Sequence, residues 1–327
     1  MTFKLANKTL TSPVLLAPMA GITDRPFRDL VTKFGAGMVV SEMVASQEMV
    51  QSKPGVRERA ELSADIENTA VQLAGRETYW MAEAARQVEG FGAKVIDINM
   101  GCPAKKVTSG ESGSALMKTP DHALRLIEAV VDAVDVPVTL KTRLGWDSTC
   151  LNAAHIAKRA QDAGVSMITI HGRTRCQFYK GTADWGAIRE VVNAVDVPVV
   201  ANGDIVDSGS AKTALAKSGA DGVMIGRGAQ GQPWILAEVS HALGATSGPV
   251  IPVGADFVDL VSEHYLSMIG FYGRPLGVRV ARKHLGWYMD HSGTPADLRR
   301  MVLTEQAPER VVSLLSDALT TPAKVAA

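Results

Sequence analysis

The chain lacks an excess of charge of either sign and any long hydrophobic run. Lysine and arginine number 34 and aspartate and glutamate also 34, so the formal net charge is zero. Proteins that coat nucleic acid non-specifically present basic charge in excess, so the balance argues against that class but allows a local basic surface. The apolar run at 14–19 is broken by Pro18. Since no run approaches the roughly 18 to 20 residues that span a bilayer, we expect no membrane segment.

Cysteine is scarce, and several motifs are missing. The three cysteines, Cys102, Cys150 and Cys176, are odd in number, far apart and outside any C-x2-C or H-x3-H pattern, so we expect no metal. The N-terminal segment also lacks the apolar stretch of a signal peptide, and together these features predict a protein of the reducing cytoplasm. Neither a Walker motif nor a G-x-S-x-G elbow occurs, so hydrolases lose their usual support.

Short β-branched runs alternate with amphipathic stretches along most of the chain. Segments such as 123–131 have the apolar spacing of a helix with one buried face. The runs between them are almost continuously apolar, like parallel strands covered by helices. Eight such units over about 230 residues predict a (β/α)8 TIM barrel, with an open doubly wound sheet as the alternative. The expected strands are Val14–Met19, Met38–Glu42, Ala70–Leu73, Val95–Asn99, Val138–Thr142, Ile168–His171, Val197–Ala201 and Gly222–Ile225.

The pattern changes after Leu243. Residues 245–255 are rich in glycine and proline without periodicity, which is typical of a linker. From Asp256 onward the spacing is helical, and no strand-like run follows. We therefore predict a barrel domain over 1–244, a linker over 245–255, a small helical domain over 256–321 and a frayed tail over 322–327.

The residues that follow the expected strands are unusually polar and rich in glycine. In a (β/α)8 barrel the working residues lie at these carboxyl ends. The loops after the last two strands, Asn202-Gly203-Asp204 and Gly226-Arg227-Gly228, contain glycines that let the backbone approach an anion, and they predict a phosphate site. The stretch 226–231 also matches G-x-G-x-x-G, but the further strand and acidic residue of a dinucleotide fold do not follow.

Three side chains at other strand ends suggest chemistry. Lys141 and His171 would reach the barrel mouth, where a cation and a hydrogen-bonding imidazole stabilise a reduced, anionic ring; each could instead be a surface charge or a satisfied core residue. Cys102 stands in a Gly-Cys-Pro loop, where a nucleophile or proton donor is at least as well supported as an inert thiol. The polar loop Lys105–Gly113 that follows has the composition of a flexible lid.

Basic residues cluster in the predicted helical domain. Arg274, Arg279, Arg282 and Lys283 fall within ten residues that contain no acid, and helical spacing places the last three on one face. This face is either a solvated basic surface or a grip on the phosphates of a nucleic acid.

These motifs occur together and in order, and their combination resembles the bacterial tRNA-dihydrouridine synthases. The match looks closest to the B branch, some members of which carry the label nitrogen-regulation protein, and it covers essentially the whole chain. The motifs that carry it are Ala17-Pro-Met-Ala-Gly-Ile-Thr-Asp-Arg-Pro-Phe-Arg28, Asp97-Ile-Asn-Met-Gly-Cys-Pro103, Gly113-Ser-Ala-Leu-Met117, Ile170-His-Gly-Arg-Thr-Arg175, Ala201-Asn-Gly-Asp-Ile205 and Arg282-Lys-His-Leu-Gly-Trp-Tyr288.

The resemblance implies an FMN-containing barrel followed by a helical tRNA-binding domain. In such an enzyme NADPH, or NADH, reduces FMN, and hydride passes to C6 of a tRNA uridine while Cys102 protonates C5. The base must leave its stack to reach the flavin. The implied FMN contacts are Pro18, Met19, Ala20, Gln72, Lys141, His171, Asn202, Gly203, Asp204, Gly226 and Arg227. The implied substrate contacts are Asn99 and Arg143 for the uracil or flavin, and Arg279, Arg282 and Lys283 for tRNA.

One departure from the family lies in the lid, which reads Thr108-Ser-Gly-Glu111 where relatives often have a basic residue, so the family's RNA contacts there do not carry over. Two other functions stay open. A reductase of a free pyrimidine, like the dihydroorotate dehydrogenases, would not need the basic helix. A non-enzymatic RNA-binding regulator would leave the polar strand ends unexplained.

Overall fold

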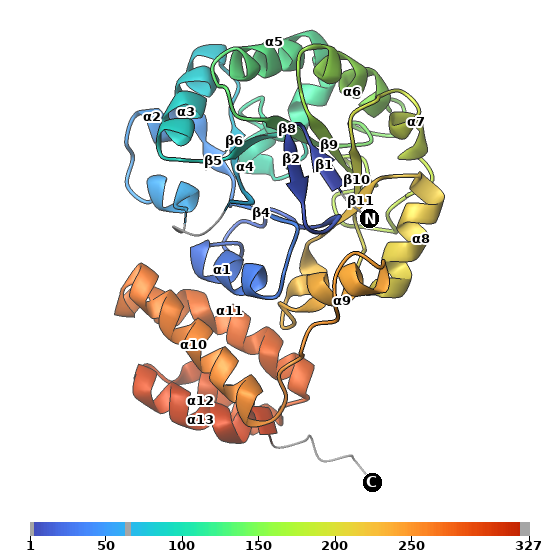
Figure 1. Ribbon diagram of the computed structural model, residues 1–327. Coiled ribbons are helices and arrows are strands. Elements are labelled where there is room, and N and C mark those ends of the chain that lie inside the picture. Colours follow the sequence, from blue (N-terminus) through green and yellow to red (C-terminus); the bar gives the residue numbers. More distant parts are fainter. Residues whose placement is uncertain (1–2, 63–66, 321–327) are drawn as a thin grey trace.

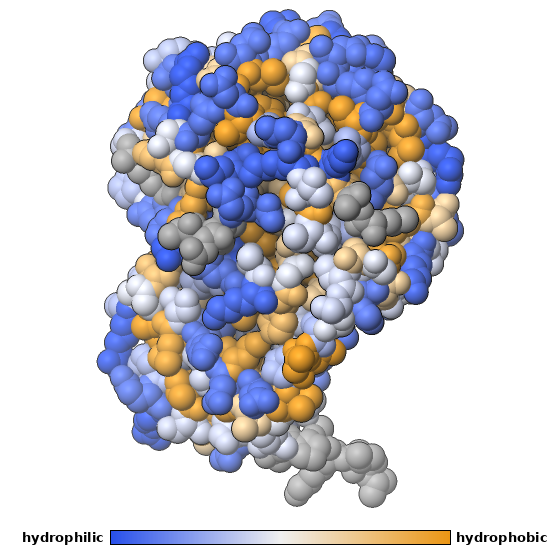
Figure 2. All heavy atoms as spheres, viewed as in Figure 1, coloured by the Kyte–Doolittle hydropathy of each residue, from blue (hydrophilic) through white to orange (hydrophobic). Residues whose placement is uncertain are grey.

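A computed structural model describes residues 3–62 and 67–320 of the chain. It has two lobes: a barrel of strands wrapped by helices, and a group of helices that follows it in the sequence (Figure 1). The same view in Figure 2 shows hydrophilic side chains over much of the barrel surface and an outline that narrows between the lobes. The predicted frayed tail over 322–327 lies outside the described residues.

Parallel strands close the barrel. The order around it is β3, β4, β6, β7, β8, β9, β10 and β11, and both the β3–β11 and β4–β6 pairings are present, so the ring is complete and the open-sheet alternative is wrong. Each of the eight predicted runs overlaps one strand, which confirms the TIM barrel. The strands are β3 (Val14–Leu16), β4 (Met38–Val40), β6 (Thr69–Ala74), β7 (Val95–Asn99), β8 (Val138–Arg143), β9 (Met167–His171), β10 (Val199–Asn202) and β11 (Gly222–Ile225).

Three predicted runs are longer than the strands that they overlap: the second strand ends at Val40, and proline limits the other two. The first strand ends at Leu16, before Pro18, and the seventh begins at Val199, after Pro198. Proline has no N–H to donate to the sheet, so it falls at strand ends. A further short strand, β5 (Val44–Ala45), pairs with the end of β6.

Helices cover the outside of the barrel (Figure 1). The longer ones are α1 (Arg25–Lys33), α3 (Thr78–Gly90), α5 (Pro120–Val131), α6 (Ala153–Asp162), α8 (Ser208–Ser218) and α9 (Ile235–Ala242). Short turns of helix are α2 (Ser46–Val50), α4 (Lys105–Thr108), α7 (Arg189–Val192) and the 3-10 segments η1 (Arg57–Ala60), η2 (Gly113–Lys118) and η3 (Arg227–Ala229). Helix α8 shows how the sequence starts such an element, because Asp207 and Ser210 form a reciprocal capping box.

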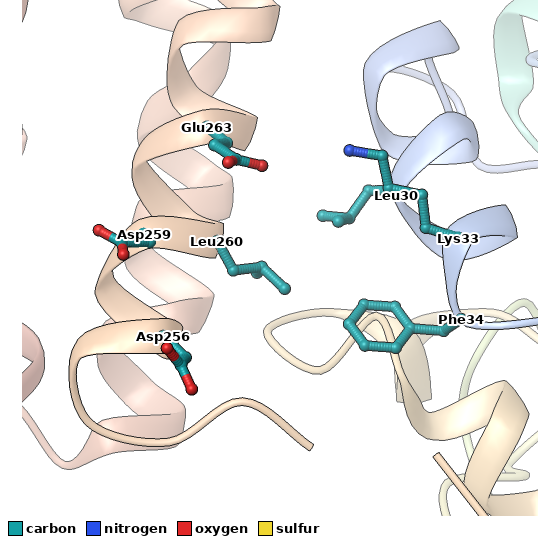
Figure 3. Close-up of a pocket in the computed structure, with 7 residues that line it drawn as sticks. All are labelled: Leu30, Lys33, Phe34, Asp256, Asp259, Leu260 and Glu263. Atoms are coloured by element: carbon teal, nitrogen blue, oxygen red, sulfur yellow. The ribbon is translucent and has the colours of Figure 1, made fainter. Parts of the chain in front are cut away.

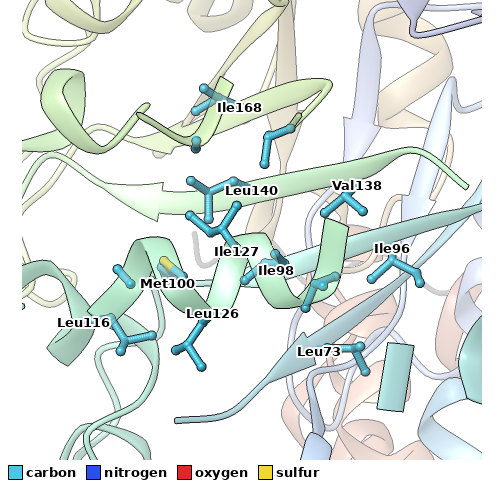
Figure 4. Packing of buried hydrophobic residues seen from close by; sticks show 14 of the residues in the cluster. Leu73, Ile96, Ile98, Met100, Leu116, Leu126, Ile127, Val138, Leu140 and Ile168 are labelled. Carbon is cyan, nitrogen blue, oxygen red and sulfur yellow. The ribbon is translucent and has the colours of Figure 1, made fainter. Parts of the chain in front are cut away.

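The largest hydrophobic core lies between the barrel wall and its helices. Figure 4 shows Leu126 and Ile127 of α5 packed near Ile98 of β7 and Leu140 of β8. Strand side chains alternate between the two faces of a sheet. Because Ile96 and Ile98 face the helices, Asp97 and Asn99 on the same strand face the barrel interior, where they bond to neighbouring strands and loops. Polar groups are thus delivered to the inside of the barrel.

An antiparallel hairpin that the sequence analysis did not predict crosses one end of the barrel. It consists of β1 (Phe3–Leu5) and β2 (Lys8–Leu10) (Figure 1). Phe3, Leu5 and Leu10 are buried in one cluster with interior residues of the barrel strands, and Phe3 lies against Gly222 at the start of β11. The hairpin therefore closes the amino end of the strands, and their carboxyl ends lie at the opposite end.

The second lobe consists of α10 (Ala255–Tyr272), α11 (Arg274–Ser292), α12 (Ala296–Thr304) and α13 (Pro308–Thr320). Its core contains Tyr265, Leu285 and Leu315. It packs on the barrel through α1, where the Phe27 ring lies 5.8 Å from His264 and 5.2 Å from His284. The helical character was predicted correctly, while the exact domain and linker bounds stay predictions. Among the described helices, none combines the length and apolar character needed to cross a bilayer.

Candidate functional site

A cavity of about 880 Å³ opens at the carboxyl ends of the barrel strands. Every one of the eight strands contributes to it, either directly or through the loop that follows. All the barrel residues that the sequence singled out line this cavity: Pro18, Met19, Ala20, Gln72, Asn99, Cys102, Lys141, Arg143, His171, Asn202, Gly203, Asp204, Gly226 and Arg227. These residues are far apart in the sequence, and closure of the barrel brings them together.

Cys102 is held at both its amide and its carbonyl. The Asn99 Oδ1 accepts hydrogen bonds from the backbone N–H of Gly101 (3.2 Å) and of Cys102 (3.0 Å). The Cys102 carbonyl accepts from the backbone N–H (3.1 Å) and hydroxyl (2.8 Å) of Ser114 in η2. The thiol is partly exposed at the cavity wall. A fixed backbone with an accessible thiol suits a group that must transfer a proton at a defined place.

Lys141 and Asn202 form a hydrogen-bonded pair across the cavity floor. The Lys141 Nζ donates to Asn202 Oδ1 (2.9 Å), and Asn202 Nδ2 donates to the carbonyl of Met224 (2.8 Å). Burial lowers the pKa of Lys141 to about 8, helped by Arg143 and opposed by Asp97 and Cys102. The ammonium is therefore still charged at neutral pH but easily deprotonated above it.

His171 lies beside this pair as a neutral imidazole. Burial lowers its pKa to about 2, and the nearby cations Lys141, Arg143, Arg173 and Arg227 act in the same direction. Its Nδ1 is buried and makes no hydrogen bond within the described part of the chain. A buried polar atom without a partner is costly, so this nitrogen is available to a ligand in the cavity.

The loop after β9 adds cavity residues that the sequence analysis missed. Tyr179 is exposed at the mouth, and its ring lies between the guanidinium groups of Arg143 (5.6 Å) and Arg227 (5.1 Å). Arg143 donates to the carbonyls of Gly101 (2.7 Å) and Phe178 (2.9 Å), which joins this loop to the Cys102 loop. The only indication of this part of the site in the sequence was an aromatic residue, Tyr179, beside a positively charged one, Lys180, in a polar loop.

The loops that predict a phosphate site meet at one side of the cavity. Gly203 has φ +110°, and a Cβ there would lie 2.9 Å from Ala183 Cβ and 3.4 Å from the His171 ring, so a glycine is required. A Cβ at Gly226 would meet its neighbours only at 3.5 Å or more. Asp204 is in the left-handed region as well (φ +54°). Its carboxylate accepts from both terminal nitrogens of Arg173 (2.9 and 2.6 Å), a pairing that the sequence analysis missed.

The expected lid is partly helical. Its first four residues form α4, whose Lys105 and Lys106 are exposed. Arg175 joins it to the loop after β9, since its Nη2 donates to the Thr108 hydroxyl (3.4 Å) while its guanidinium lies 4.7 Å from the centre of the Trp146 ring. A lid function for this segment stays a prediction.

The basic residues of α11 lie outside the cavity and in three different settings. Arg279 is exposed, whereas the Nε and Nη2 of Arg282 are buried without a hydrogen bond from the described residues. Lys283 donates to the carbonyl of Gly21 (2.5 Å), in the loop that also carries Met19 and Ala20 to the cavity. The helical spacing was thus a poor guide to what each side chain meets, and a role in binding nucleic acid stays a prediction.

A second cavity, of about 220 Å³, lies where α10 faces α1 (Figure 3). Asp256, Asp259 and Glu263 of α10 line it together with Lys33 of α1, and Figure 3 shows Glu263 projecting toward α1 while the Asp259 carboxylate points away from it. The positive character of α11 is therefore not shared by this side of the helical lobe. Within the described residues, no group of three or more histidine, cysteine, aspartate or glutamate side chains could hold a metal ion.

Comparisons with known proteins agree on one family. A family model described as dihydrouridine synthase (Dus) matches residues 15–323. The chain is 63% identical over 309 residues to a probable tRNA-dihydrouridine synthase of Rhodobacter capsulatus, covering 94% of this chain and 95% of that protein. It is 52% identical over 311 residues to a probable tRNA-dihydrouridine synthase of Rhizobium leguminosarum (94% and 95% covered). It is 46% identical over 298 residues to tRNA-dihydrouridine synthase B of Vibrio vulnificus (91% and 92% covered).

Proposed function

Because the chain belongs to the dihydrouridine synthase family, we propose that it reduces the C5–C6 double bond of uridines in tRNA, with FMN in the barrel cavity and NADPH as reductant. The observation that carries the proposal is the convergence of Cys102, Lys141, His171 and two glycine loops on one cavity. Membership of this family disfavours a reductase of free pyrimidines and a regulator without catalytic activity.

Several features of the cavity fit a flavin nucleotide. The backbone at Gly203 and Gly226, with the half-exposed Arg227 beside them, suits a phosphate. Because Arg173 already neutralises the Asp204 carboxylate, we expect Asp204 to contribute its backbone amide instead. The unpartnered Nδ1 of His171 and the ammonium of Lys141 would meet the polar edge of the ring system. The remaining FMN contacts would come from Pro18, Met19, Ala20, Gln72 and Asn202.

FMN bound there would supply, to C6 of the uracil, a hydride that it receives from NADPH. Cys102 would hold the proton for C5, because saturating the ring requires an acid timed with the hydride. Arg143 leaves its Nη2 without a hydrogen bond in the described residues, so this nitrogen can orient the base, and Asn99 lies beside it. The exposed ring of Tyr179 offers a flat surface on which a base extruded from its stack can pack.

A pair of cysteine variants tests the proposal. Cys102→Ala should retain its flavin spectrum and its reduction by NADPH yet reduce uridine in tRNA about 100-fold or more slowly in a single turnover, as loss of a general acid predicts. The matched control is Cys176→Ala, an exposed cysteine outside the cavity lining, which should react at the wild-type rate. Undiminished dihydrouridine formation by Cys102→Ala would contradict the role of Cys102 as the acid. Purified protein without bound FMN would contradict the proposed cofactor.

A further inference from the structure

The barrel interior contains a buried carboxylate to which the proposed reaction assigns no role. Asp97 on β7 is 2% exposed. Its Oδ1 accepts a hydrogen bond from the Thr139 hydroxyl (2.6 Å) and its Oδ2 accepts from Gln72 Nε2 (2.7 Å). Burial raises the pKa of Asp97 to about 6. Burying an acid is expensive, and the interior cluster beneath it, toward the amino ends of the strands, is apolar, so packing alone does not account for this residue.

The hydrogen bonds of Asp97 continue to the Cys102 loop through two side-chain amides. An amide has a donor end and an acceptor end, whereas a carboxylate only accepts. Gln72 must therefore turn its nitrogen to Asp97, which leaves its Oε1 to accept from Asn99 Nδ2 (2.8 Å). The Asn99 oxygen then faces the backbone N–H groups of Gly101 and Cys102. The Asp97 carboxylate therefore sets the orientation of both side-chain amides. It thereby also sets which atom of Asn99 faces the Cys102 amide.

We propose that Asp97 is a positioning residue for Cys102, acting through Gln72 and Asn99 to hold the backbone from which the thiol reaches the substrate. The role rests on the proposed function of Cys102. The second anchor of the loop, from Ser114 to the Cys102 carbonyl, comes from η2 and does not depend on Asp97. Without Asp97 the Asn99 oxygen is no longer held toward the Cys102 amide, while the bonds from Ser114 to the Cys102 carbonyl and from Arg143 to the Gly101 carbonyl remain, so the thiol shifts without being lost.

Three variants of this network separate positioning from general stability. Asp97→Leu has the same branching as aspartate but offers no acceptor to Gln72. Thr139→Val removes the hydrogen bond at the other oxygen of the same carboxylate and leaves the Gln72 bond in place. Asp97→Asn keeps one acceptor oxygen for Gln72, while its NH2 group can donate to a lone pair of the Thr139 hydroxyl.

Two measurements are made on each variant as holoenzyme. The first is the alkylation rate of Cys102 by iodoacetamide, resolved by peptide mass spectrometry, with Cys176 in the same molecules as internal reference. The second is single-turnover uridine reduction after reduction by NADPH. For Asp97→Leu we expect the Cys102/Cys176 alkylation ratio to change about tenfold and uridine reduction to fall about 10- to 100-fold, since small displacements of a reacting group are costly. Thr139→Val and Asp97→Asn should stay within about threefold of the wild type.

The proposal is overturned if Asp97→Leu keeps the wild-type alkylation ratio and rate, or if Thr139→Val matches Asp97→Leu in both. Should the leucine variant not fold, Asp97→Ala is judged by the same criteria. The alkylation ratio does not depend on the reaction. A changed ratio therefore supports the positioning role even where Cys102→Ala retains full activity, a result that would count against the proposed function of Cys102 alone.

Discussion

Replacing Arg173 with methionine should destabilise the barrel, although this arginine is absent from the cavity lining. Arg173 is 1% exposed and follows β9. Its guanidinium donates to both Asp204 oxygens and to the carbonyls of Lys180 (3.1 Å) and Gly181 (2.5 Å). It thereby joins the loops after β9 and β10, and methionine fills a similar space without making any of these bonds.

The magnitude follows from what remains buried. Removing one partner of a buried ion pair costs about 3–5 kcal/mol because the other charge is left uncompensated. The Asp204 side chain is 29% exposed and keeps the bond from Ala183 N–H (2.8 Å), so we take the lower end, about 3 kcal/mol. An unfolding entropy of about 2.1 cal/mol/K per residue gives about 0.7 kcal/mol/K for 327 residues, and hence a fall in Tm of about 4 °C.

Arg227→Met is the matched control. Arg227 approaches the same carboxylate at 3.6 Å, but its side chain is 58% exposed, so water screens the pair and we expect about 0–1 kcal/mol. Thermal unfolding of both variants, followed by far-UV circular dichroism at pH 7, measures the difference. An equal fall in Tm for the two would refute the argument that burial sets the value of this pair.

Three further predictions concern other buried or linking groups. Lys283→Met removes the hydrogen bond to the Gly21 carbonyl, so this variant should release FMN more readily on dialysis than Arg279→Met. Arg279→Met is the control because it also removes one positive charge from α11. Equal retention of FMN by the two variants contradicts this prediction. Because the pKa of Lys141 is about 8, the rate of flavin reoxidation by tRNA should decline as the pH rises through that value. In Lys141→Met the rate should be low and independent of pH from about pH 7 to about 9. If the rate of the variant also declines with pH, the decline belongs to another group. Burial raises the pKa of Asp24 from 3.8 to about 6, so the folded protein binds the extra proton and stability falls as pH rises between these values. Asp24→Asn, which keeps the acceptor that caps α1, should gain up to about 3 kcal/mol at pH 7 in urea unfolding and show a flatter pH dependence, and a slope equal to the wild type contradicts this.

The barrel and its cavity were predictable because buried parallel strands have a distinctive residue pattern. Strands buried on both faces are almost continuously apolar, and the polar residues that follow them meet at one end of the barrel. These two facts suffice to bring Cys102, Lys141 and His171 to one cavity. The positions after the strands needed no knowledge of loop conformation, since the strand itself delivers the side chain.

The missed features depend on contacts between loops or lobes. Arg173 and Asp204 follow different strands, and the sequence around each of them does not predict that they form an ion pair. Tyr179 lies in a loop without periodicity, preceded by Phe178 in the left-handed region (φ +53°). Helical spacing placed Lys283 on a basic face, but it could not predict the hydrogen bond from Lys283 to the carbonyl of Gly21. The hairpin did leave a signal, since Ala6-Asn7 separates two short alternating segments by two residues.

The hairpin that closes the amino end of the barrel has a consequence for the order of events during translation. Phe3, Leu5 and Leu10 leave the ribosome before any barrel strand, yet they pack in one cluster with Met224 of the last strand. At about 5–20 residues per second, the chain between Leu10 and Met224 takes roughly 10 to 40 s to synthesise. Until then the hairpin has an incomplete set of partners. The hairpin is thus made before all the barrel strands but reaches its final place after them, and the barrel is sealed only once β11 has been made.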